Sequence, residues 1–210
     1  MNLPNRITVG RFVFAFVLFA YLVATDTGSG PDARWWEPAI AGLVFIGVVV
    51  TDALDGYYAR KLNLQTDFGR IADPVVDKVL VAGALVFLAS AGWARPLVPV
   101  WMVVLVLARE YMVSGLRGFI EARGVAFPAR WDGKLKMVLQ CIAIPAVFLH
   151  RTLVLVVGDG WEAGAWTTDA SWWLAFVFVW ASFALTVSSG ARYVVAAAKV
   201  LRGSSAAADA

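Results

Sequence analysis

The chain has 210 residues, of which 60% are hydrophobic and only 16% are charged, and its mean hydropathy is +0.73. Because a soluble domain carries about a quarter charged residues, this composition excludes a single water-soluble core and indicates an integral membrane protein. The net charge of +3 is small, and the one cysteine, Cys141, excludes a disulfide within the chain.

Six apolar runs follow one another, each long enough for about 20 residues of membrane-spanning helix. They cover residues 7–25, 37–58, 74–94, 97–116, 135–157 and 171–198. The first run lacks a small-residue cleavage site, and Asp26 and Thr27 interrupt it, which favours a retained helix over a signal peptide. We expect an all-α membrane protein with one six-helix domain over residues 1–202 and a disordered tail over residues 203–210.

Basic residues are distributed unevenly between the expected connections. Most lie near the termini or in the second and fourth connections: Arg6, Arg11, Arg60, Lys61, Arg70, Arg117, Arg123, Arg130, Lys134, Lys136, Arg192, Lys199 and Arg202. The other three connections hold only Arg34, Arg95 and Arg151. Because Lys and Arg are enriched in cytoplasmic loops, both termini and the connection between the second and third runs are expected in the cytoplasm.

Four aspartates lie at this cytoplasmic end of the second and third runs. Asp52 and Asp55 are three residues apart and Asp73 and Asp77 four apart, so each pair shares one helix face. Asp52 lies roughly 12 Å from the helix end near Arg60, at a rise of about 1.5 Å per residue. Carboxylates at this depth are costly and usually face a polar cavity, a partner or an ion, which makes them candidate functional residues.

The short polar connection over residues 61–66 predicts that these two helices are antiparallel neighbours with both carboxylate pairs together. Hard oxygen ligands without nearby Cys or His favour Mg²⁺, Mn²⁺ or Ca²⁺ over zinc or copper. Asp52, Asp55, Asp73 and Asp77 provide enough ligands for two ions about 3.5 to 4 Å apart on a phosphate or pyrophosphate. Helix packing alone would explain Gly56, Ala59 and Gly69, but beside the aspartates these small residues also offer a pyrophosphate a close approach.

The aspartates belong to a longer pattern, D-x2-D-G-x2-A-R-x8-G-x3-D-x3-D, which the chain fits without a gap from Asp52 to Asp77. This pattern resembles the signature of the CDP-alcohol phosphatidyltransferases. The segments Asn2–Arg11, Ala108–Arg117 and Gly133–Lys136 are similar to those of phosphatidylglycerophosphate synthases within that family. Met137 departs from the threonine that many of these synthases carry.

The resemblance implies transfer of the phosphatidyl group from CDP-diacylglycerol to sn-glycerol 3-phosphate, giving phosphatidylglycerophosphate and CMP. It implies that Mg²⁺, as two ions with Mn²⁺ as an alternative, is held by the aspartates, and that Asp77 is also the catalytic base. It places the donor lipid at a further set of residues: Gly56, Ala59, Arg60, Thr66 and Gly69. The expected partners are these substrates, the bilayer and a second copy in a homodimer, and no nucleic acid is expected.

The acceptor phosphate needs cations near the metal site. The candidates are Arg109, Arg117, Lys134 and Lys136. Arg109 lies eight residues inside the fourth run, counted back from Arg117, although a salt bridge with Glu110 or another helix explains it equally well. Arg117, Lys134 and Lys136 have an alternative role as contacts to anionic headgroups.

Three other functions fit parts of the pattern. The same chemistry could use inositol phosphate, serine or another alcohol as acceptor. Membrane prenyltransferases also bind diphosphates through Mg²⁺ and aspartates, but they lack the A-R-x8-G-x3-D-x3-D continuation. A cation transporter predicts acids throughout the membrane depth or broken helices at its midplane, whereas these aspartates gather at one end.

Overall fold

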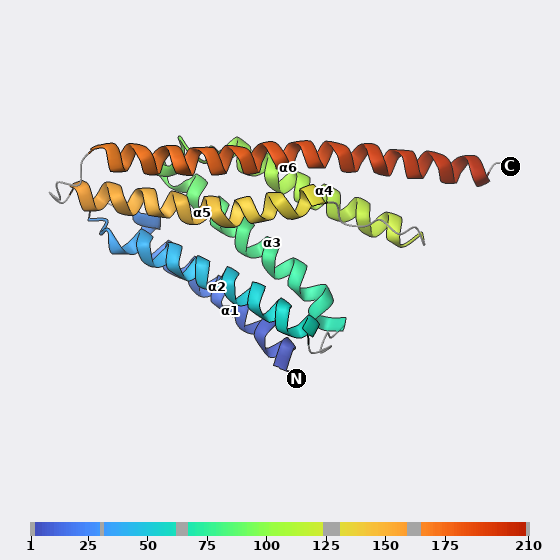
Figure 1. The fold of residues 1–210 in the computed structure, drawn as a ribbon, viewed down its shortest axis with the longest axis horizontal. Helices are drawn as coiled ribbons and strands as arrows, with labels where there is room; N and C mark the ends of the chain where they lie inside the picture. The colour runs from blue at the N-terminus through green and yellow to red at the C-terminus, as the bar shows by residue number, and fades with distance from the viewer. Residues whose placement is uncertain (1–2, 30–31, 62–66, 124–130, 159–164, 209–210) are drawn as a thin grey trace.

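The computed structural model describes residues 3–29, 32–61, 67–123, 131–158 and 165–208. These residues form α-helices and two short 3-10 helices, with no strand among them (Figure 1). The α-helices are α1 (Leu3–Ala24), α2 (Trp36–Lys61), α3 (Asp67–Ser90), α4 (Val100–Glu121), α5 (Trp131–Gly158) and α6 (Ala165–Ala208). The 3-10 helices are η1 (Asp26–Gly28) and η2 (Gly92–Ala94).

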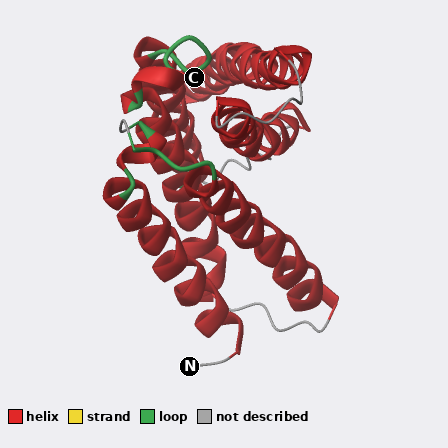
Figure 2. Ribbon diagram, turned by 90° about the vertical axis from the view of Figure 1, so that its left-hand side faces the viewer, coloured by secondary structure: helices red, strands yellow, loops and turns green. Residues whose placement is uncertain are grey.

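Successive helices run in opposite directions, so that α1, α3 and α5 point toward one end of the molecule and α2, α4 and α6 return from it (Figure 1). Figure 2 shows the described loops together on one side of the helices. Helix α1 packs against α2 and α3, α5 packs against α2 and α6, and α4 packs against α3 and α6. The fold is therefore a helical assembly in which α1 contacts both aspartate-bearing helices.

The surface of the bundle is apolar where a soluble protein would be polar. On α1, Val13 and Phe14 are 54% and 59% exposed, whereas Ala15 and Leu18 are buried against the other helices. Arg109 and several serines are instead buried. Lipid tails solvate apolar side chains and cannot solvate charges, so this inverted distribution is what a bilayer favours.

Three segments of the described chain are long and apolar enough to cross a membrane: Trp36–Leu54, Gly133–Gly158 and Thr168–Val200. A shorter apolar helix covers Val9–Ala24. Helices α3 and α4 have 24 and 22 residues, which is a sufficient length, but both carry ionisable residues inside their apolar runs. The all-helical fold agrees with the sequence prediction, and the helices with the weakest apolar character carry most of the candidate site.

A left-handed turn ends α1 where the sequence predicted an interruption. Asp26 and Thr27 have φ of 45° and 52°, a region that costs energy for residues other than glycine. The carbonyl of Thr27 accepts a 3.0 Å hydrogen bond from Trp93 Nε1, and that of Gly28 accepts two bonds from Arg151. These contacts hold the turn against η2 and α5, at the end of the molecule away from the aspartates.

Helix α6 is longer than the sequence predicted. It continues to Ala208, whereas the sequence predicted a disordered tail over residues 203–210. Ala206, Ala207 and Ala208 explain the difference, because alanine has the highest helix propensity and continues an existing helix at little cost. In Figure 1 the C-terminal part of α6 extends beyond the other helices.

Candidate functional site

Three of the four signature aspartates gather around one arginine of α1. Arg11 Nη2 donates a 2.7 Å hydrogen bond to Asp73 Oδ1, and Arg11 Nη1 lies 3.3 Å from Asp77 Oδ1. The same Nη1 forms an ion pair with Asp52 Oδ1. We call Asp52, Asp73, Asp77 and Arg11 the acidic cluster.

Burial is unequal within the acidic cluster. The Arg11 side chain is 5% exposed, whereas those of Asp52 and Asp73 are 36% and 45% exposed. A buried guanidinium is stable only if carboxylates or other acceptors compensate for its lost hydration. The carboxylates provide this compensation, and their outer sides stay accessible to a ligand.

Helix α1 joins the two aspartate-bearing helices. The sequence predicted direct antiparallel packing of α2 and α3, but in the described residues Asp52 of α2 meets Asp73 and Asp77 of α3 through Arg11 of α1. The sequence explains this arrangement. Arg11 is inside the apolar run of α1, where a charge needs a partner, and the aspartates of α2 and α3 need a counter-charge. The convergence of Asp52 with Asp73 and Asp77 is thus indirect.

Other residues of the predicted donor site are only partly covered by the structure. Asp55, Gly56, Ala59 and Arg60 lie on α2 and Gly69 lies on α3, while their side-chain surroundings are outside the described part of the chain. Thr66 lies wholly outside the described residues. Their assignment to the metal and the donor lipid stays a prediction.

The acidic cluster has the right donors for a hard divalent ion. Its carboxylate oxygens already surround a cationic group, the Arg11 guanidinium, and oxygen is the ligand that Mg²⁺ and Mn²⁺ prefer. Within the described residues, no three Asp, Glu, His or Cys side chains are close enough together to hold one metal ion. The carboxylates are therefore spaced for a guanidinium, and an ion would require them to approach one another.

A second group of charges joins α3, α4 and α5. Lys136 Nζ and Arg109 Nη1 both donate to Glu110 Oε1, the latter at 2.8 Å. Lys78 Nζ donates to Ser114 Oγ, which in turn donates a 2.7 Å bond to the Glu110 carbonyl. We call Lys78, Arg109, Lys136 and Glu110 the basic cluster, in which Arg109 and Lys136 share one carboxylate and Lys78 is joined through Ser114.

Helix α6 shapes the position of Arg109 in the basic cluster. Arg109 Nη2 donates a 2.9 Å bond to Ser189 Oγ, and the guanidinium carbon lies 5.8 Å from the centre of the Tyr193 ring. A Cβ atom on Gly190 would lie 2.7 Å from Arg109 Cγ, so only glycine leaves room for this side chain. Arg109 Nε is buried and has no hydrogen-bond partner among the described residues. One donor of this buried cation is thus left unsatisfied, and an anion would reach it only after the side chain moves.

The structure separates the four residues predicted for the acceptor phosphate. Arg109 and Lys136 are 8% and 5% exposed and meet at Glu110, so the salt bridge considered for Arg109 is present. Arg117 Nε instead lies 3.1 Å from Glu121 Oε1, one turn along α4. Lys134 is exposed, with its Nζ 5.8 Å from the centre of the Trp131 ring. In the part of the chain that the structure describes, no hydrogen bond or ion pair joins Arg117 or Lys134 to the basic cluster.

Two residues escaped the sequence prediction. Arg11 was counted among the cytoplasmic flanking cations, although the apolar run surrounds it and thereby signalled a buried charge. Lys78 follows the last signature aspartate and also lies inside an apolar run. Because Asp77 contacts Arg11 while Lys78 contacts Ser114, these adjacent residues connect the acidic cluster to the basic cluster.

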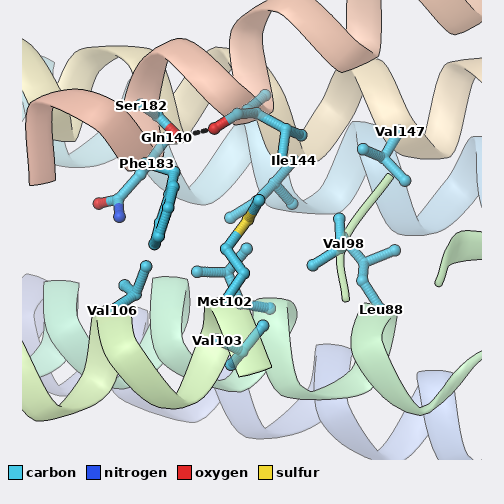
Figure 3. Close-up of a pocket in the computed structure, with 13 residues that line it drawn as sticks. Leu88, Val98, Met102, Val103, Val106, Gln140, Ile144, Val147, Ser182 and Phe183 are labelled. Atoms are coloured by element: carbon cyan, nitrogen blue, oxygen red, sulfur yellow. Dashed lines mark hydrogen bonds between the residues drawn. The ribbon is translucent and has the colours of Figure 1, made fainter. Parts of the chain in front are cut away.

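A cavity lies elsewhere in the bundle, between α3, α4, α5 and α6. Figure 3 shows Met102, Val106 and Ile144 among the side chains around it. Gln140 and Ser182 are the only polar side chains in its lining, and no residue of either cluster takes part. Apolar walls without ionisable groups offer no chemistry, so the candidate site is the pair of clusters.

Known proteins are similar in sequence to this chain over most of its length. Residues 1–188 match the family model described as CDP-alcohol phosphatidyltransferase. A Bacillus subtilis (strain 168) protein named CDP-diacylglycerol--glycerol-3-phosphate 3-phosphatidyltransferase is 35% identical over 196 residues, covering 91% of this chain and 93% of the relative. A Mycobacterium tuberculosis (strain CDC 1551 / Oshkosh) protein named probable phosphatidylglycerophosphate synthase is 34% identical over 202 residues, covering 96% and 84%. The family match includes every residue of both clusters.

Proposed function

The chain belongs to the CDP-alcohol phosphatidyltransferase family, and we propose that it transfers the phosphatidyl group from CDP-diacylglycerol to sn-glycerol 3-phosphate, giving phosphatidylglycerophosphate and CMP. One observation carries the proposal. Asp77 of the acidic cluster and Lys78 of the basic cluster are adjacent on α3, so a site for a divalent ion borders a site for an anion. Such a border suits a reaction between a pyrophosphate donor and a phosphorylated acceptor.

The donor lipid, CDP-diacylglycerol, binds at the acidic cluster. Asp52, Asp55, Asp73 and Asp77 would hold the divalent ions, two Mg²⁺ with Mn²⁺ as an alternative, since carboxylate oxygens are suitable ligands. Bound there, the ions would neutralise the negative charge of the donor's pyrophosphate. The partial exposure of Asp52 and Asp73 leaves the cluster open to the nucleotide lipid.

The remaining donor contacts come from the rest of the signature. The backbone at Gly56, Ala59 and Gly69 gives the lipid's headgroup a close approach, because these residues carry little or no side chain. Arg60 binds a phosphate and Thr66 hydrogen-bonds the base or ribose.

Asp77 accepts the proton of the acceptor hydroxyl. As the hydroxyl oxygen forms a bond to the phosphorus that carries the lipid, the bond from that phosphorus to the CMP oxygen breaks, and the proton passes to the Asp77 carboxylate. Asp77 suits this role because it lies on the side of the acidic cluster that borders Lys78. Arg11 contacts Asp77 at the edge of hydrogen-bonding distance, 3.3 Å, and leaves that carboxylate the least tightly held of the three.

The acceptor phosphate occupies the basic cluster. Lys78, Arg109 and Lys136 outnumber Glu110, and in low-dielectric surroundings such an excess of positive charge favours an anion strongly. A phosphate monoester is a dianion near neutral pH and matches that excess. Arg109, whose Nε has no partner among the described residues, would bind it after its side chain moves away from Gly190.

In the membrane, all six α-helices span the bilayer, with both termini and the two clusters on the cytoplasmic side. The alternating helix directions and the distribution of Lys and Arg support this topology. CDP-diacylglycerol then reaches the site from the lipid phase and glycerol 3-phosphate from the cytoplasm. A homodimer in the cytoplasmic membrane is part of the proposal and follows family precedent.

Purified protein incubated with CDP-diacylglycerol and separate acceptors, with Mg²⁺ or EDTA, tests the proposal by release of CMP. We expect release with glycerol 3-phosphate and Mg²⁺, and none with EDTA. Release with inositol phosphate or serine but not with glycerol 3-phosphate would move the assignment to another acceptor. Undiminished release in EDTA would exclude the metal-assisted reaction.

A further inference from the structure

The Arg11 guanidinium lies among the aspartates that would hold a divalent ion. Its contacts go to the Oδ1 atoms of Asp52, Asp73 and Asp77, one oxygen from each carboxylate. Each carboxylate shares its charge between two oxygens, and Arg11 contacts one of them; an ion bound to the same oxygens would lie at about 2.0 to 2.6 Å from them. A guanidinium and an ion cannot share the same oxygens at the centre of the cluster, because they overlap and repel each other.

Deprotonation of Arg11 cannot release the aspartates for a metal ion. Guanidinium groups keep their charge in proteins, so only a movement of the side chain can free the carboxylates. The side chain is buried against α2 and α3, and its Nε has no hydrogen-bond partner among the described residues. The contact is therefore incomplete on the arginine side, whereas the carboxylates face a partly open surface.

The geometry points to Arg11 as a resident counter-cation that holds the acidic cluster together without metal and competes with the divalent ion for its carboxylates. Rearrangement of Arg11 away from the aspartates then accompanies metal binding. The inference rests on the metal site of the proposed function. It assigns a role in setting the metal affinity to α1, which lies outside the signature.

The inference predicts that binding of the divalent ion and binding of the donor lipid are coupled. An anionic pyrophosphate beside the cluster offers the displaced guanidinium a new partner, which removes part of the cost of moving it. Donor and metal should therefore each raise the affinity for the other, and this coupling should require Arg11.

The direct test measures Mn²⁺ binding to the purified chain without substrates. Electron paramagnetic resonance detects the free and bound Mn²⁺. We expect Arg11→Gln to bind Mn²⁺ at least about tenfold more tightly than the unmodified chain, since one competing positive charge is removed. Its melting temperature without divalent ions should be lower, and Mn²⁺ should raise that temperature more than in the unmodified chain. Arg95→Gln is the matched control, because Arg95 is exposed beyond the far end of α3.

Unchanged or weaker Mn²⁺ binding in Arg11→Gln would overturn the inference, because Arg11 would then orient the carboxylates without competing. If Arg11→Gln does not fold, Arg11→Lys replaces it: an ammonium lacks the planar fork that spans three carboxylates, so tighter Mn²⁺ binding is still expected. Unchanged affinity in Arg11→Lys would count against the inference. Absence of Mn²⁺ binding from the unmodified chain and every variant would remove the metal site itself, and with it the proposed reaction.

Discussion

The acidic and basic clusters both place charged side chains between apolar helices, but the excess charge is negative in the first and positive in the second. In the acidic cluster three carboxylates share the Arg11 guanidinium, whereas in the basic cluster Arg109 and Lys136 share the Glu110 carboxylate and Lys78 binds Ser114. Each cluster contains enough opposite charge to keep the helices together but less than full compensation. Both arginines also keep a buried Nε without a partner among the described residues.

The difference between the clusters supports the proposed placement of each substrate. The acidic cluster is open on its carboxylate side and buried on its arginine side, so a cation can approach it. The basic cluster is buried on its cationic side, with Arg109 and Lys136 less than one tenth exposed, so an anion that enters it is held away from water. Charge interactions are strong in such surroundings. The contrast predicts separate effects of mutations on metal, donor and acceptor.

Asp77→Asn should have the largest effect, because it removes the proton acceptor while keeping the shape of the side chain. We expect kcat to fall by about a hundredfold to ten-thousandfold, the usual range for loss of a general base. Binding of CDP-diacylglycerol should change much less. Steady-state CMP release and equilibrium binding of the donor check the two parts, with Asp169→Asn, an exposed residue of α6, as control. Near-normal kcat would remove Asp77 from the chemistry.

Arg109→Gln should act on the other cluster. It removes a charged donor from the acceptor phosphate, and loss of a charge-assisted hydrogen bond of about 1.5 to 3 kcal/mol corresponds to a rise in KM of about tenfold to a hundredfold. KM for CDP-diacylglycerol and the affinity for Mn²⁺ should stay nearly constant. Lys134→Gln offers the comparison at an exposed position of the same charge type, where we expect little change. Equal rises in both KM values would indicate a structural role for Arg109.

Gly190→Ala should have a smaller effect of the same kind. The added methyl group would lie 2.7 Å from Arg109 Cγ and displace the guanidinium. We expect KM for glycerol 3-phosphate to rise by about threefold to tenfold, consistent with an overpacking cost of about 1 kcal/mol. Gly47→Ala is the control, because no atom lies within 4 Å of a Cβ at that position. A greater effect on the donor than on the acceptor would separate Gly190 from the basic cluster.

The sequence predicted the helical fold from apolar runs and grouped the aspartates from their spacing, since both are periodic features of single helices. The partners across helices were beyond this reasoning. Arg11 lies far from the aspartates in the chain, and only the packing of α1 against α2 and α3 brings it to them. Spacing did contain one unused signal: residues two apart on a helix point about 200° apart, so Lys134 and Lys136 could not both face the interior.

Lys78→Gln tests most directly whether the two clusters divide the substrates, because Lys78 is adjacent to Asp77 in the chain but bonded to Ser114 of α4. The decisive measurement is KM for each substrate of the purified variant, together with its Mn²⁺ affinity. We predict a several-fold rise in KM for glycerol 3-phosphate, with KM for CDP-diacylglycerol and Mn²⁺ affinity unchanged. A change in donor KM or Mn²⁺ affinity as large as the change for the acceptor would contradict the division into two sites.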